Sequence, residues 1–264
     1  MIGTNLIIEL VVLTIVIHLI DTLAYSVRLS SVKNGNFALS TSLFNLIVLI
    51  SRTANMLQGP LIGTIIEESI RIKYNPINEM RYVISASTIG TILGIVLIPT
   101  FLKVFSKSVL KLEDTGSIPS LVIQSLSIAN IKRIKNGTVR PSKSMIRGLR
   151  YKNIPKKMLL INAVITGIYT IGVLAAYYAS IYVPDKRLAV SASSGMINGI
   201  ASILLTIFID PMASIITDEA YRGKREYGDV KTLVIMLIST KLIGTLLGQL
   251  LLIPGAKFIT LFFR

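Results

Sequence analysis

The sequence predicts an all-α polytopic membrane protein with six transmembrane helices, arranged as two three-helix repeats of inverted topology. Three observations lead to this prediction. The 264 residues are 52% hydrophobic, and they contain separate apolar runs long enough to cross a bilayer, for which about 20 apolar residues suffice. Basic residues gather between particular runs, and motifs from the first half of the chain return in the second half.

We expect the six spans at residues 5–27, 38–66, 82–104, 157–182, 189–216 and 231–256. No positively charged segment or small-residue cleavage site precedes the first run, so we expect a retained span and not a removed signal. The chain then divides into a first three-helix repeat (1–105), a basic connection (106–156) and a second three-helix repeat (157–264).

The basic residues predict how the chain crosses the membrane. Thirteen Lys or Arg residues lie from Lys103 to Lys157, and by the positive-inside rule this connection is cytoplasmic. Both termini are then outside, and nineteen basic residues lie inside against seven outside, with Arg52 and Lys241 within spans. Because this charge adjoins hydrophobic runs, the net +15 indicates anionic membrane lipids as partners and not nucleic acid.

The basic connection contains two segments of interest. Residues 142–152 place Met145, Ile146 and Leu149 on one side of a helix, which favours an interfacial helix on the membrane surface. Residues 117–131 are apolar but weakly periodic. Three placements stay open for this second segment: on the surface, re-entering the bilayer, or packed under the helix bundle.

Two comparisons of the chain with itself indicate the repeat. A shift of 151 residues sets Pro60 against Pro211, and a shift of 154 sets residues 89–94 against 243–248. Because each half has three spans and the connection stays inside, the second half must run through the membrane upside down. In inverted-repeat transporters, helices interrupted at matching positions adjoin the substrate site, so we predict helix breaks at Pro60 and Pro211.

Other glycines and prolines in the spans suggest structural roles. The third and sixth spans carry small-xxx-small glycine pairs, which predict close packing of helix backbones: Gly90 with Gly94, and Gly244 with Gly248. Pro99 and Pro254 are expected to end their helices.

Polar side chains inside four of the spans point at a common interior. In the first span, His18, Asp21, Tyr25 and Arg28 recur at intervals of three and four residues and form one stripe. The other three spans contribute Arg52, Asn55 and Gln58, then Asp210, and finally Lys241. The third and fourth spans are expected to be packing or lipid-facing walls.

Two interpretations of the charged groups are open. An arginine near the bilayer centre costs on the order of 3 kcal/mol on insertion scales, so it persists where it meets a partner, a cavity or a ligand. In the first interpretation, Asp21 neutralises Arg52 and Asp210 neutralises Lys241, which only fixes helix register. In the second, which the intervening polar residues favour, Arg52 and Lys241 bind an anion in a hydrated cavity.

The remaining polar residues have supporting roles in the cavity interpretation. Asn55 and Gln58 supply neutral donors. His18 lies one helical turn from Asp21, and it either carries a proton or only hydrogen-bonds a neighbouring helix.

Several classes of protein are excluded by what the sequence lacks. The chain has no Cys and a single His, which excludes a structural zinc site and a disulfide framework, so no metal is expected. Neither a phosphate-binding loop nor a dinucleotide fingerprint is present, so we expect no cofactor, no ATP hydrolysis and no enzyme.

Five segments resemble the Amj family, the bacterial lipid II flippases that act as alternates to MurJ: His18–Arg28, Leu49–Gln58, Pro60–Gly63, Asp210-Pro211 and Asp218. The similarity spans the whole chain and is densest from His18 to Glu67. It implies movement of an undecaprenyl-diphosphate-linked peptidoglycan precursor from the inner to the outer leaflet of the bacterial cytoplasmic membrane.

The sequence therefore predicts a lipid II flippase that works by alternating access. Arg52 is the expected main ligand of the head group, with Lys241 assisting and Tyr25 and Arg28 nearby. Asp21 and Asp210 hold the cations while the cavity is empty. Two alternatives remain: an ion-coupled transporter of a small hydrophilic solute, which needs a closed midplane pocket, and a non-transporting envelope scaffold, whose polar stripes pair off completely.

Overall fold

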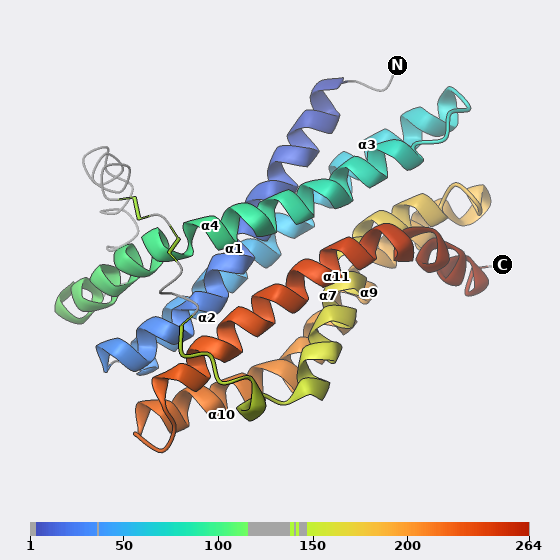
Figure 1. Ribbon diagram of the computed structural model, residues 1–264. Coiled ribbons are helices and arrows are strands. Elements are labelled where there is room, and N and C mark those ends of the chain that lie inside the picture. Colours follow the sequence, from blue (N-terminus) through green and yellow to red (C-terminus); the bar gives the residue numbers. More distant parts are fainter. Residues whose placement is uncertain (1–3, 36, 116–137, 140, 143–146, 264) are drawn as a thin grey trace.

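The computed structural model describes residues 4–35, 37–115, 138–139, 141–142 and 147–263 (Figure 1). These residues form helices and turns and no strand, and six helical segments are long and apolar enough to cross a membrane. The predicted fold class and number of spans are thus confirmed. The six segments are Thr4–Lys33, Phe37–Arg71, Ile77–Val109, Lys156–Ala179, Pro184–Tyr221 and Tyr227–Leu261.

Helices are the expected outcome for such runs, because a bilayer offers no hydrogen-bond partners to the backbone. The first half contains α1 (Thr4–Asn34), α2 (Phe37–Met56), α3 (Gln58–Arg71) and α4 (Ile77–Thr115). The second half contains η2 (Tyr151–Asn153), α7 (Lys156–Ala179), η3 (Pro184–Lys186), α8 (Arg187–Ala192), α9 (Ser194–Leu204), η4 (Leu205–Ile209), α10 (Asp210–Tyr221) and α11 (Tyr227–Leu261). Several helices run past the expected spans into polar sequence. α4, with 39 residues, is about 58 Å long, well beyond the hydrocarbon thickness.

Three helices form the centre of the molecule. α1 packs along α4 and α2, α7 packs along α11 and α9, and α11 joins the two groups by contacting both α4 and α1 (Figure 1). The close crossings fall at the predicted small residues. A Cβ on Gly90 would lie 2.4 Å from the Ile15 carbonyl oxygen, and a Cβ on Gly244 would lie 2.6 Å from the Ala163 carbonyl oxygen.

The second and fifth spans are each interrupted near their middle. α2 stops at Met56, and α3 begins at Gln58, two residues before Pro60. In the fifth span, η4 is one turn of π-helix that ends at Ile209, and α10 then starts at Asp210-Pro211. Both interruptions therefore come directly before the prolines that the repeat sets against each other. The inverted relation between the halves stays a prediction.

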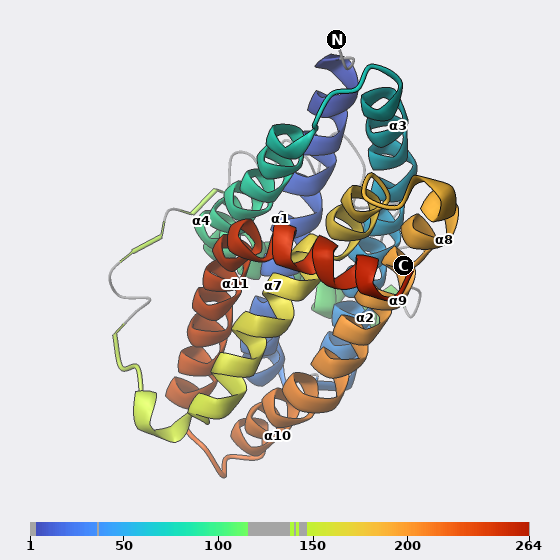
Figure 2. The same ribbon diagram turned by 90° about the vertical axis from the view of Figure 1, so that its right-hand side faces the viewer.

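The expectation that Pro99 and Pro254 end their helices is wrong. Pro99 lies inside α4, and Pro254 lies inside α11. A long membrane helix tolerates a proline where neighbouring helices and side chains compensate for the lost hydrogen bond, at the expense of a bend. Figure 2 shows the C-terminal end of α11 turned across the bundle.

Two apolar clusters enclose a polar layer at mid-bundle. One cluster contains Leu10, Ile62, Ile84, Leu174 and Leu252. The other contains Leu29, Ile209, Leu233 and Leu237. On α1, α7 and α11, the residues between the two clusters include the predicted charged groups, so the fold holds the site away from both ends of the bundle.

The basic connection is described only in part. The segment 117–131 lies outside the described residues, as do residues 143–146 of the predicted interfacial helix. The described residues 147–150 contain a turn and lead into η2, so the predicted α-helix is wrong for these four residues. Here Arg150 donates its backbone N–H to Thr232 Oγ1 (2.7 Å) and its guanidinium lies beside Glu226, which fastens the end of the connection to α11. The hydrogen bond to Glu226 raises the pKa of the Arg150 guanidinium.

Candidate functional site

A cavity of about 80 Å³ lies in the polar layer, between the first, second, fourth, fifth and sixth spans. On this measure a single water needs roughly 10–15 Å³, so the cavity holds several waters or a small anion. Six of the predicted site residues line it together: His18, Asp21, Tyr25, Arg52, Asp210 and Lys241. The remaining lining comes from Ala24, Phe44, Val48, Thr166, Tyr169, Ser202 and Leu205.

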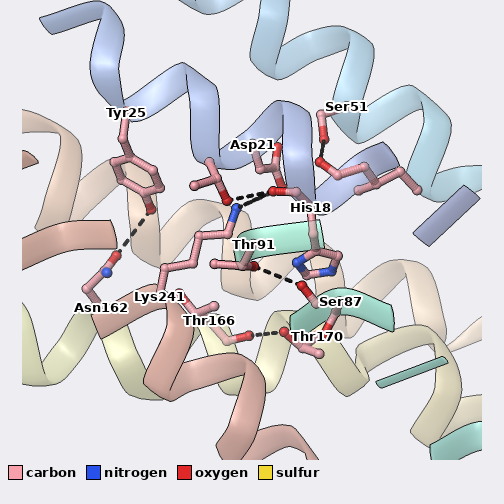
Figure 3. A network of polar contacts seen from close by, with 12 residues as sticks. His18, Asp21, Tyr25, Ser51, Ser87, Thr91, Asn162, Thr166, Thr170 and Lys241 are labelled. Atoms are coloured by element: carbon pink, nitrogen blue, oxygen red, sulfur yellow. Dashed lines mark hydrogen bonds and ion pairs between the residues drawn. The ribbon is translucent and has the colours of Figure 1, made fainter. Parts of the chain in front are cut away.

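Lys241 is buried (3% exposed) and held by α1. Its Nζ donates to the His18 carbonyl oxygen at 3.3 Å and lies 3.8 Å from Asp21 Oδ2 (Figure 3). It also lies 5.8 Å from the centroid of the Tyr25 ring. The ammonium is therefore paired with Asp21 in this conformation, and an anion that enters the cavity competes with this carboxylate for it.

Arg28 forms the second charge pair. Its Nη2 lies 3.1 Å from Asp210 Oδ1, at the first residue of α10. The guanidinium also packs 5.0 Å from the centroid of the Phe44 ring. A carboxylate in the first turn of a helix is favoured by the helix dipole, so the position of Asp210 in α10 is favourable in addition to its pair with Arg28.

The predicted partners of the two carboxylates are therefore wrong. Asp21 pairs with Lys241 and not with Arg52, and Asp210 pairs with Arg28 and not with Lys241. The cause is the position along α1: the same face meets α11 at the level of residues 18 to 21 and meets α10 two turns further along, at Arg28.

Arg52 is the third cation of the site, and it differs from Lys241 and Arg28 in having no carboxylate partner in the described residues. It is half-buried on α2, and within the described part of the chain it makes neither a hydrogen bond nor an ion pair. It lines the central cavity and also a second one of about 340 Å³, which Asn55 lines as well. A guanidinium carries five N–H donors in a fixed fork, so an unpartnered one in a cavity is suited to an oxyanion.

Gln58 is placed differently from the other predicted site residues. It is 5% exposed, and its Nε2 donates to Thr14 Oγ1 at 3.0 Å. Gln58 thus joins α3 to α1, and it does not line the described cavities. Arg28 lines a third cavity, together with Asp210, at the α10 end of the site.

The expectation that the fourth span is a packing or lipid-facing wall is right for packing but wrong for the site. In α7, 67% of the residues in the most apolar stretch are buried, and Thr166 and Tyr169 line the central cavity. Asn162 of the same face accepts from Tyr25 Oη at 3.4 Å (Figure 3). It also donates to the Leu237 carbonyl oxygen. The intervals of four and three between Asn162, Thr166 and Tyr169 are a helical stripe that the sequence already displayed.

Two of the charged or titratable residues on α1 have buried atoms without hydrogen-bond partners, His18 Nδ1 and Arg28 Nη1. Buried polar atoms are normally satisfied, so these two mark places where water or a ligand group belongs. In the described residues, no three His, Asp or Glu side chains gather as a metal site would need.

Fold and site together define a polytopic helical membrane protein with a charged cavity at mid-bundle. The chain belongs to the Amj family, described as "Alternate to MurJ", which matches residues 13–263. The lipid II flippase Amj of Bacillus subtilis (strain 168) is 40% identical over 247 residues, which cover 93% of this chain and 92% of that relative. No solved structure matches the chain.

Proposed function

We propose that the protein is a lipid II flippase, which moves the undecaprenyl-diphosphate-linked peptidoglycan precursor from the inner to the outer leaflet of the bacterial cytoplasmic membrane. The likeness over nearly the whole chain to a relative named as such supports this function. The observation that carries the proposal is Arg52, a guanidinium without a partner in a cavity at mid-bundle. Lipid II brings the diphosphate that such a group binds.

The three cations have different roles in this proposal. Arg52 is free and meets the diphosphate first. Lys241 assists only after the diphosphate displaces Asp21, and Asp21 holds the ammonium again once the substrate has left. Each exchange replaces one anion by another, so Lys241 keeps a counter-ion throughout the cycle.

Orientation and surroundings complete the proposal. The basic connection (106–156) faces the cytoplasm and attracts anionic lipids, and both termini lie outside. His18 lies beside the Asp21–Lys241 pair, so a proton on its imidazole would add positive charge to the site and strengthen its attraction for the anionic diphosphate. The chain performs no covalent chemistry, and alternating access moves the substrate.

Reconstitution into liposomes tests the function. Purified protein should transfer fluorescently labelled lipid II between leaflets. The measurement is the fraction of the fluorescence that a membrane-impermeant quencher removes, which reports the label in the outer leaflet. Arg52→Ala should lower the rate at least tenfold, and Arg52→Lys should retain part of it, because an ammonium keeps the charge but not the fork. Arg71→Ala is the matched control, since Arg71 is exposed and pairs only with Glu68.

Two outcomes would reject the proposal. Wild-type protein that leaves labelled lipid II in its original leaflet is not a flippase. Full activity in Arg52→Ala would remove Arg52 from the mechanism. Uptake of a small hydrophilic solute driven by a pH gradient, without lipid II transfer, would favour the ion-coupled transporter.

A further inference from the structure

Four cavities lie in one row between the second and fifth spans. The central cavity shares Phe44 and Asp210 with a cavity of about 220 Å³ on the α10 side. On its other side it shares Arg52, Tyr169 and Ser202 with the cavity of about 340 Å³. That cavity in turn shares Pro60 and Tyr177 with one of about 390 Å³ beside α8. We call this row the α2–α9 groove.

Polar and small residues line the α2–α9 groove at intervals within walls that are otherwise largely apolar. On each turn of the fifth span, a polar side chain or a glycine lines the groove. These residues are Ser191, Ser194, Gly195, Asn198, Gly199, Ser202, Thr206 and Asp210. The second span contributes Ser40, Asn45, Arg52, Asn55 and Gly59. The outward faces of the same helices are apolar, as Leu49 (60% exposed) and Ile200 (55% exposed) illustrate.

Unsatisfied atoms concentrate in this groove. Among the residues that the structure describes, five side-chain atoms are buried without a hydrogen-bond partner. Four of them belong to residues that line the groove: Ser40 Oγ, Arg28 Nη1, His18 Nδ1 and Asn198 Oδ1. Such groups cost free energy unless water or a ligand satisfies them, so the groove is built for a polar occupant.

The two sides of the groove pack mainly on different helices. α2 lies against α1 and α9 lies against α7, although α3 also contacts α7 and α10 also contacts α1. The second and fifth spans make little direct contact with each other in the described residues. Their contact at one end is the pair Phe37 and Tyr221, whose ring centroids are 6.0 Å apart. Moving the second span away from the fifth would therefore leave the α1–α4 and α7–α11 packing intact, but it would break the contact of α3 with α7.

We infer that the α2–α9 groove is the route by which the polar head group crosses the bilayer, while the polyprenyl tail stays in the surrounding lipid. This inference rests on the proposed function and specifies its pathway. The groove passes from the α10 end, past Arg28 and Arg52, to the α8 end. The central cavity has the smallest volume of the four, so α2 must move away from α9 and α10 there for a sugar–peptide head group to pass.

Filling the groove without disturbing the fold tests the inference. A Cβ on Gly195 or Gly199 would meet no atom within 4 Å, so a large side chain enters empty space there. Gly199→Trp and Gly195→Trp should each lower lipid II transfer in liposomes at least tenfold. Gly199→Ala should lower transfer much less than Gly199→Trp, because one methyl group fills far less of the route.

The matched control is Ile203→Trp, which places the same side chain on the outward face of the same helix. Ile203 is 56% exposed and lines none of the described cavities. It should transfer lipid II at the wild-type rate, and the thermal midpoints of all four variants should lie close to that of wild type.

A second measurement uses the absence of native cysteine. Ser202→Cys should react with a water-soluble maleimide, and added lipid II should slow this reaction several-fold, whereas Ile203→Cys should not react. Wild-type transfer by Gly199→Trp and Gly195→Trp, or equal loss in Ile203→Trp, would overturn the route and leave the flippase function standing. Equal reactivity of the two cysteines would overturn it as well. Absence of transfer by wild type would reject function and route together.

Discussion

The Arg28–Asp210 pair permits a quantitative prediction about stability. Asp210→Asn removes the carboxylate 3.1 Å from Arg28 Nη2 and leaves a guanidinium that is only 9% exposed without a counter-ion. Breaking a fully buried pair typically costs about 3–5 kcal/mol. The Asp210 side chain is 38% exposed, and the Phe44 ring still faces the guanidinium in the variant, so we expect about 2 kcal/mol here.

A loss of about 2 kcal/mol corresponds to a thermal midpoint roughly 4–8 °C lower for a chain of this size. The protein contains no Trp, so the transition is better followed by circular dichroism or by size exclusion after heating. Asp185→Asn, at an exposed position in η3, is the control and should leave the midpoint unchanged.

A double variant separates the charge effect from other consequences. Arg28→Gln combined with Asp210→Asn removes the stranded cation, so it should recover about half of the stability lost in Asp210→Asn. Arg52→Ala should leave the midpoint unchanged, since Arg52 has no partner to strand. Additive losses in the double variant, or an unchanged midpoint in Asp210→Asn, would refute this account of the pair.

Three further predictions concern helix contacts. Gly90→Ala should cost about 1–3 kcal/mol, because its Cβ would lie 2.4 Å from the backbone oxygen of Ile15; a midpoint equal to that of Gly195→Ala would contradict this. Gln58→Leu should lower stability by about 1 kcal/mol through loss of its bond to Thr14 and retain lipid II transfer, whereas loss of transfer would return Gln58 to the substrate site. Asp229→Asn should weaken the hydrogen bond from Asn153 Nδ2 (2.9 Å), which joins η2 to α11, and should therefore speed tryptic cleavage near η2. An unchanged cleavage rate would show that this bond does not hold η2 in place.

The six spans could be predicted from the sequence, because the hydropathy of a run determines whether it crosses a bilayer, whatever the details of helix packing. Each of the six runs is a helix in the structure, and the interruptions of the second and fifth spans come just before Pro60 and Pro211. Pro99 and Pro254 misled the prediction because the same residue type bends a helix in one place and ends it in another. Their outcome depends on whether neighbouring helices support the backbone.

The partners of the charged groups could not be predicted for a different reason. A stripe such as His18, Asp21, Tyr25 and Arg28 shows that four side chains share a face, but not toward which neighbour each part of that face points. Over the seven residues from Asp21 to Arg28 the neighbour changes from α11 to α10, and the partners change with it. The substrate-binding roles of these residues stay predictions.

Which polar side chains are paired, and how the cavities connect, favours one of the proposed functions over the others. A scaffold needs polar stripes that pair off completely, yet Arg52 remains unpartnered in the described structure and four groove residues carry unsatisfied buried atoms. A carrier of a small solute needs an enclosed pocket, yet the central cavity of about 80 Å³ continues into larger ones on both sides, along two spans that scarcely touch. The α2–α9 groove is a row of cavities with polar side chains beside the lipid. It suits a diphosphate-linked lipid, because the polar head group of such a substrate can pass along the groove while its apolar tail stays in the bilayer.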